Sequence, residues 1–253
     1  MVRFLLRPRW LAGLGLVVLV AVTFTRLGVW QLHRLDERRT YEDLVASRLA
    51  AAPVPLEDVL AGGADADAIR YRRVTVSGTY DTAHEVILYG RTQGDQSGNH
   101  VLTPLILDDG SAVAVDRGWV PFEDDSPPLA DAAPPDGMVR VTGVLFPPEA
   151  ETAPPSLSPS LAPSSAAAPT TTFAKVDLGA LAAQVPYRLA PAYLLLGSQQ
   201  PAAAALPLVA PLPDAADAPP HLSYAIQWFS FATIAVVGFV VLVRREYRRS
   251  LAG

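Results

Sequence analysis

Residues 219–229 read PPHLSYAIQWF, and no charged residue interrupts the run from Leu222 to Val243. These 22 residues would form a helix about 33 Å long, enough to cross the roughly 30 Å hydrocarbon core of a bilayer. The two prolines cannot continue the helix backwards, so it is expected to begin near His221. Four arginines follow within residues 244–249. We therefore predict a transmembrane helix over residues 221–243.

A second apolar run lies near the N-terminus, over residues 10–30, with three arginines in the nine residues before it. A cleaved secretory signal shares these features, but no small-residue cleavage site follows the run, and its apolar character resumes after Arg26. We therefore predict a second transmembrane helix. Because arginine-rich flanks mark the cytoplasmic side, both tails, residues 1–9 and 244–253, are expected in the cytoplasm. With no transit peptide apparent, a bacterial cell membrane is expected, crossed in multi-pass fashion.

Composition limits the chemistry of the segment between the two runs. This segment holds 24 of the 25 acidic residues but only 12 of the 20 basic ones. Its predicted extracytoplasmic location and negative charge argue against nucleic acid as a partner and against docking on anionic lipid. Cysteine is absent, which excludes disulfides, thiolate metal sites and thiol nucleophiles.

The segment over residues 65–199 predicts a β domain. Val74–Tyr80 and Val139–Leu145 share a Val-x-Val-x-Gly alternation, the period of half-buried strands. The glycine inside each strand indicates a bulge or sharp bend, as barrels need at their corners. Further strands are predicted over 85–89, 101–107, 112–119 and 192–196, with a hairpin turn at Asp109-Gly110. We expect a mostly antiparallel domain, either a small barrel or a sandwich.

Less regular segments connect these elements. Residues 31–64 predict an exit helix followed by a linker. Residues 147–172 are rich in proline, alanine, serine and threonine and predict a disordered insertion. Residues 177–185 predict a short helix, and residues 200–220 a second linker that leads to the last helix.

The histidines are the main candidates for chemistry, and none forms a closely spaced metal-binding pair. No nucleophile elbow, phosphate loop or dinucleotide fingerprint is present. His221 permits two interpretations. It can be a polar residue at a helix start, or an axial ligand to a haem, because Tyr224, Trp228 and Phe231 follow on the same helical face. Aromatic residues are also typical of any membrane interface, so the spacing leaves both interpretations open.

Three motifs together resemble the surfeit locus 1 family. LGVWQLHR at residues 27–34 resembles the exit of its first span, and HLSYAIQWF at 221–229 resembles the entry of its second. VAVDRGWVP at 113–121, preceded by LTPL at 102–105, resembles its central strand. The motifs occur in the expected order between the expected spans. The similarity covers most of the chain, apart from residues 147–172 and 200–217.

This resemblance implies an assembly factor for the haem a-containing terminal oxidase, cytochrome c oxidase, and not an enzyme. It implies that haem a is bound transiently or that its insertion into the catalytic subunit is aided, with His221 as the iron ligand. Oxidase subunit I, other oxidase assembly factors and membrane lipid are the implied partners. The alternative from another class is a permanent accessory subunit of a respiratory complex that delivers no haem.

The remaining candidate residues lie around these motifs. Arg117 and Trp119 are either a solvated arginine beside a core tryptophan, or a surface that faces the oxidase or a haem propionate. Gln31 and Gln227 are expected at similar depth, where polar side chains commonly bond across helices, so a Gln31–Gln227 hydrogen bond is predicted. The full set comprises the haem candidates His221, Tyr224, Trp228 and Arg117, and the partner-facing or interhelical candidates Trp30, Gln31, Arg34, Gly118, Trp119 and Gln227.

Overall fold

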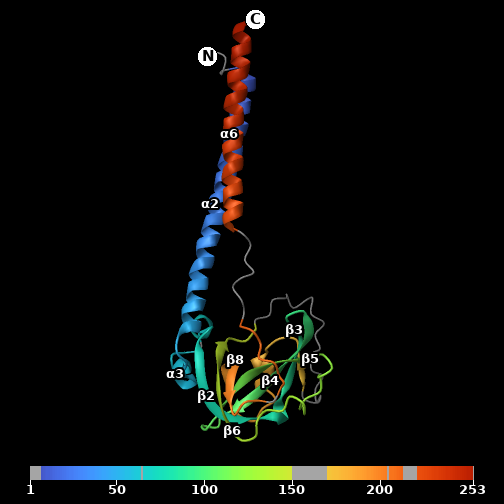
Figure 1. The fold of residues 1–253 in the computed structure, drawn as a ribbon. Helices are drawn as coiled ribbons and strands as arrows, with labels where there is room; N and C mark the ends of the chain where they lie inside the picture. The colour runs from blue at the N-terminus through green and yellow to red at the C-terminus, as the bar shows by residue number, and fades with distance from the viewer. Residues whose placement is uncertain (1–6, 64, 150–169, 204, 213–220, 253) are drawn as a thin grey trace. The chain divides into compact units, whose positions relative to one another are not determined.

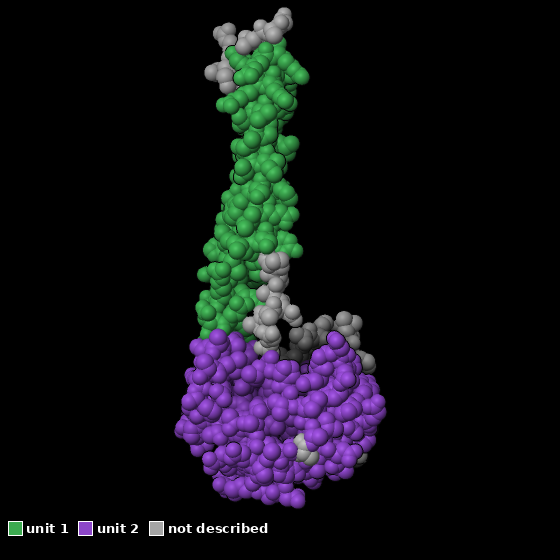
Figure 2. All heavy atoms as spheres, viewed as in Figure 1, with its two compact units in different colours: residues 1–44, 214–253 green, residues 45–213 purple. Residues whose placement is uncertain are grey.

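The computed structural model describes residues 7–63, 65–149, 170–203, 205–212 and 221–252. The chain divides into two compact units, residues 1–44 with 214–253, and residues 45–213 (Figure 2). Most of the predicted insertion, residues 150–169, lies outside the described residues, as do residues 213–220 of the second linker.

The first unit consists of α6 (His221–Ala252) and all but the last turns of α2 (Pro8–Ala50), two long helices (Figure 1). Both are long and apolar enough to cross a membrane. α6 begins at His221, as the preceding prolines predict. The predicted exit helix is a direct continuation of α2, supported by Arg34–Glu37 and Arg38–Glu42 ion pairs of 3.0 and 2.7 Å at helical spacing.

The two helices contact each other through aromatic side chains on their apolar faces. A Cβ added at Gly28 would lie 2.7 Å from the ring of Phe229, so glycine is what admits this ring against the α2 backbone. Further along, the ring of Trp10 lies 6.2 Å from that of Phe239. Small residues that let a partner approach are typical of helix pairs in membranes, because packing and not water exclusion drives association there.

The second unit is built on an eight-stranded sheet with the order β1-β2-β6-β8-β5-β4-β3-β7. Its strands are β1 (Val54–Pro55), β2 (Arg73–Tyr80), β3 (Val86–Gln93), β4 (Gln96–Ile106), β5 (Ala112–Pro121), β6 (Met138–Phe146), β7 (Thr172–Phe173) and β8 (Leu189–Gln200). The short helices are α3 (Leu56–Ala61), α4 (Ala66–Ile69), the 3-10 helix η1 (Thr82–His84) and α5 (Leu178–Ala182). The predicted strands and the short helix near residue 180 are therefore confirmed.

The sheet closes on itself. β2 pairs with β6 along its length and with β4 at Thr79–Ile106 and Tyr80–Leu105, so that β2, β6, β8, β5 and β4 form a ring. Alternating side chains of the ring strands fill its interior, among them Val74, Val76, Val113, Val115, Val139, Val141, Leu194 and Leu196. Of the two architectures predicted, the strand pairings correspond to the barrel.

Most pairings in the sheet are antiparallel, as expected, but the sheet is mixed. β1–β2, β3–β7 and β5–β8 are parallel pairs. β8 enters the sheet between β6 and β5, at the end of a long connection that includes α5. Parallel neighbours require such a long crossover. Alternation along a strand reports which face is buried but not the direction of its neighbour, so the sequence could not reveal this pairing.

Two glycines allow the ring to close. A Cβ at Gly78 would lie 2.3 Å from the carbonyl oxygen of Ile106, where β4 meets β2, and one at Gly143 would lie 2.3 Å from that of Leu195. The register shifts next to Gly143, as the predicted bulge requires. The register around Gly78 is continuous, so this glycine serves close approach and not a bulge.

The second unit extends beyond the predicted boundary at residue 65. Val45, near the end of α2, is buried in one cluster with Tyr71 and Val144. The Arg48 guanidinium donates to the carbonyl oxygens of Asp67 and Arg70, at 2.6 and 2.7 Å. The last turns of α2 thus belong to the packing of the β unit.

Candidate functional site

The first candidate site lies at the start of α6. The Nδ1 of His221 lies 2.8 Å from the Oε1 of Gln31 in α2, so one side-chain hydrogen bond joins the two helices. An amide oxygen can only accept, and therefore Nδ1 donates and carries the ring proton. Within the described parts of the chain, Nε2 of this half-buried histidine has no hydrogen-bond partner.

Aromatic side chains follow His221 along α6, as its spacing predicts. Trp228 and Phe231 lie 6.0 Å apart, and both contact Phe24 of α2, at 5.4 and 5.8 Å between ring centroids. Tyr224 is 44% exposed. The aromatic wall is therefore present, but Phe24 covers part of it. Phe24 is one apolar residue in a long apolar run, so the sequence carried no signal that singled it out.

The predicted Gln31–Gln227 hydrogen bond is wrong, because Gln31 bonds to His221 and Gln227 is exposed. Gln227 follows His221 by six residues, which at about 100° per residue places it roughly 120° away around the helix. Trp30 is 52% exposed, and Arg34 is also exposed and paired with Glu37. Partner-facing roles for Trp30, Arg34 and Gln227 remain predictions.

The second candidate site is a buried ion pair in the β unit. The side chains of Arg117 and Glu85 are each 1% exposed, and Arg117 Nη1 donates to Glu85 Oε2 at 2.9 Å. Thr103 Oγ1 donates to the same oxygen at 2.8 Å. The backbone N–H of Leu129 donates to Glu85 Oε1 at 3.0 Å, and Arg117 Nη2 donates to the carbonyl oxygen of Ala132.

This network corrects the interpretation of Arg117. The guanidinium is neither solvated nor on a surface that could meet a haem propionate, because its charge is neutralised inside the protein. Burial lowers the pKa of Arg117, and the Glu85 carboxylate acts in the opposite direction. The network joins the residue before β3 to β4, β5 and the β5–β6 connection, which assigns Arg117 to the structure of the domain.

Gly118 and Trp119 also serve internal packing. Trp119 is 5% exposed, which agrees with a core tryptophan, and its backbone N–H and carbonyl bond to Leu208 at 2.7 and 2.8 Å. Gly118 has a φ of 118°, and a Cβ there would lie 2.1 Å from the carbonyl oxygen of Leu208. The glycine admits the 206–210 segment against β5.

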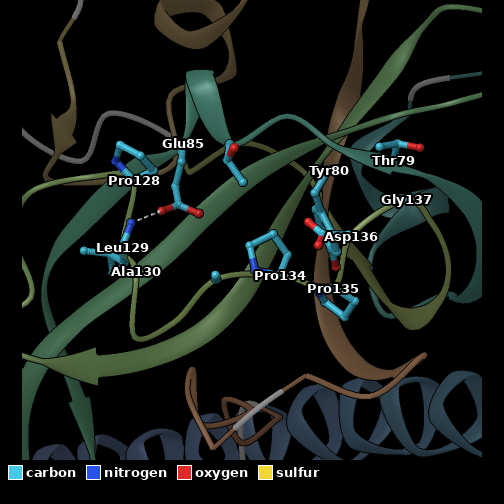
Figure 3. Close-up of a pocket in the computed structure, with 12 residues that line it drawn as sticks. Thr79, Tyr80, Glu85, Pro128, Leu129, Ala130, Pro134, Pro135, Asp136 and Gly137 are labelled. Carbon is cyan, nitrogen blue, oxygen red and sulfur yellow. Dashed lines mark hydrogen bonds between the residues drawn. The ribbon is translucent and has the colours of Figure 1, made fainter.

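A cavity of about 370 Å³ lies beside this network, between the β2–β3 region and the β5–β6 connection (Figure 3). Glu85 and Tyr80 reach its lining, together with Asp136. The Tyr80 ring lies 5.4 Å from the Arg117 guanidinium, and its hydroxyl donates to Gln199 at 2.9 Å. Burial raises the pKa of Tyr80, so the phenol stays neutral. The Glu85 carboxylate and the Tyr80 hydroxyl are therefore both hydrogen-bonded within the fold.

Two of the other histidines, His84 and His100, belong to the β unit. His84 Nδ1 is 2.6 Å from Asp81, which also accepts from Tyr187 at 2.7 Å, and His100 Nδ1 is 2.9 Å from Asp116. Burial by itself would raise the pKa of Asp81. The hydrogen bonds from Tyr187 and His84, together with the charge of His84, outweigh burial, so the pKa of Asp81 is lowered. Among the described residues, no group of three or more metal-ligating side chains gathers.

Comparison with known proteins identifies the family. A model of the SURF1 family matches residues 18–233. The chain belongs to the SURF1 family. A SURF1-like protein of Mycobacterium tuberculosis is 32% identical over 264 residues, which cover 99% of this chain and 90% of that protein.

More distant relatives come from other groups. A SURF1-like protein of Rickettsia felis is 25% identical over 94% of this chain and 97% of its own length. The human Surfeit locus protein 1 is 30% identical over 145 residues, 51% of this chain and 47% of that protein. The resemblance read from the three motifs is thereby confirmed, and the SURF1 match includes both Gln31 and His221.

Proposed function

We propose that this SURF1 family member is an assembly factor for a haem a-containing terminal oxidase, and that it holds haem a as cargo at the His221 end of the α2–α6 pair. The observation that carries the proposal is the state of His221. Its Nδ1 is engaged by Gln31, while its Nε2 has no partner among the described residues. A histidine with one nitrogen fixed and the other available is the arrangement of a haem or metal ligand.

The residues around His221 fit such a cargo. The exposed Tyr224 ring and the partly exposed Trp228 and Phe231 offer apolar surface suited to a macrocycle. His221 binds iron only as the neutral imidazole. One protein ligand also permits release, which delivery to the oxidase requires. Bound haem a would carry the iron that the mature oxidase uses.

The alternative is a permanent accessory subunit of a respiratory complex. Quantitative co-purification from wild-type cells distinguishes the two, because an assembly factor leaves its client. We expect tagged protein at well below one copy per mature oxidase, and a higher ratio in cells whose haem a synthesis is blocked. Equimolar recovery under both conditions would contradict the proposal and favour the subunit.

The same proposal places both termini in the cytoplasm and the β unit outside a bacterial cell membrane. Two apolar helices of sufficient length and the arginines that flank them support this topology. The chain has no cysteine, so single cysteines can be placed freely. A membrane-impermeant maleimide should label Asp109→Cys in intact cells but Arg249→Cys only after permeabilisation. Equal labelling of the two variants would refute the topology.

A further inference from the structure

We infer that Gln31 is a positioning residue that holds His221 in the tautomer protonated on Nδ1, so that Nε2 is the nitrogen offered to a ligand. Only the consequence for haem a rests on the proposed function. The effect of Gln31 on the imidazole itself follows from the hydrogen bond of 2.8 Å between the helices.

The packing of the helix pair brings the two residues within reach. Gly28 lies three residues before Gln31 on α2, and the Phe229 ring sits against it. On the facing side, Ala225 lies one turn after His221 and is 1% exposed. The contact of the Phe229 ring with Gly28 thus lies one turn of α2 from the hydrogen bond. The His221–Gln31 hydrogen bond therefore has a second contact between the same two helices beside it.

The chemistry of the pair determines which nitrogen is available. A neutral imidazole has one protonated and one unprotonated nitrogen, and a hydrogen bond at one of them selects the tautomer. An isolated histidine favours the proton on Nε2, which would leave Nδ1, the nitrogen nearer the backbone, as the acceptor. The Gln31 oxygen reverses this preference. An amide also supplies the acceptor without placing a charge beside the neutral imidazole at the start of α6.

Gln227 provides the matched control for Gln31. Both are glutamines of the helix pair, Gln31 in the hydrogen bond to His221 and Gln227 six residues after His221, but Gln227 is exposed and turned away from the helix contact. Gln31→Leu removes the acceptor, Gln31→Glu retains one, and Gln227→Leu removes an amide that does not contact His221. Any general effect of replacing a glutamine of the helix pair with leucine appears in both leucine variants.

The test is nitrogen NMR of full-length protein in lipid nanodiscs without haem, labelled on histidine rings and assigned with His221→Ala. Spectra are compared at about pH 8.5, since the two tautomers are defined for the neutral imidazole. We expect Nδ1 protonation in the wild type, Gln31→Glu and Gln227→Leu, and a shift toward Nε2 protonation in Gln31→Leu. Haem a titration of the same samples should weaken by about tenfold to hundredfold in Gln31→Leu alone.

The outcomes separate this inference from the proposed function. An unchanged tautomer in Gln31→Leu, or a failure of Gln31→Glu to restore Nδ1 protonation, overturns the role of Gln31. A tautomer shift without haem a binding by the wild type supports the role of Gln31 and contradicts the proposed function. Haem a binding that is equal in all variants, with the tautomer shifted, would show that Nε2 is not the nitrogen that binds.

Discussion

Replacing His221 with alanine is expected to remove bound haem a from the purified protein and to lower the haem a content of the assembled oxidase. The variant deletes the candidate ligand and leaves the helix contacts at Gly28 and Phe229 in place. Loss of the ligand should reduce haem occupancy by more than about tenfold, since even loss of a residue that only orients a ligand costs tenfold to hundredfold. Optical spectroscopy of the purified protein and of the membranes measures both effects.

His33→Ala is the matched control for this variant. His33 also lies on α2 close to Gln31, but it is exposed and makes no hydrogen bond to a described residue of α6. His84→Ala and His100→Ala remove the histidines that pair with Asp81 and Asp116 in the β unit. These three variants should retain their haem. Full occupancy with an unchanged spectrum in His221→Ala would make His221 an interfacial residue and no ligand.

Arg117→Met should destabilise the β unit more than any surface substitution. The variant leaves the Glu85 carboxylate, whose side chain is 1% exposed, without its counter-charge. Breaking a buried pair in this way typically costs about 3–5 kcal/mol. Denaturant unfolding of the full-length protein measures the loss, followed by circular dichroism and by tryptophan fluorescence, to which the buried Trp119 contributes. The effect should appear as reduced stability and protein level.

Two further variants test the cause of that loss. Arg140 lies on β6 and is exposed, so Arg140→Met removes the same charge and should change stability by less than about 0.5 kcal/mol. Adding Glu85→Gln to Arg117→Met removes the stranded charge and should recover part of the stability. Equal effects of Arg117→Met and Arg140→Met would show that the buried pair contributes nothing.

The strands of the β unit could be predicted because each carries a local signal. Alternation marked β2 and β6, and Asp109-Gly110 marked the turn between β4 and β5, where Gly110 has a φ of 78°. The position of β8 could not be predicted, since its neighbours are set by contacts between distant segments. The burial of Arg117 was missed for the same reason, because its partner Glu85 precedes it by 32 residues.

The helix-pair site was predicted only in part. The prolines at residues 219 and 220 fixed the start of α6, and with it the position of His221 at the helix end. Gln31 and Gln227 were expected at a similar depth in the membrane, which suggested Gln227 as the partner of Gln31. Depth does not show in which direction around the helix a side chain points. The rotation of α6 that turns His221 toward α2 follows from the packing of Phe229 on Gly28, which only the structure reveals.

The most direct test of haem a binding is the reduced-minus-oxidised optical spectrum of the wild-type protein, purified from membranes of cells that make haem a. We expect a haem a spectrum in the wild type that disappears in His221→Ala, while circular dichroism shows the variant to be folded. Wild-type protein that carries no haem a from such cells, and takes up none when haem a is added, would contradict the claim that this protein holds haem a.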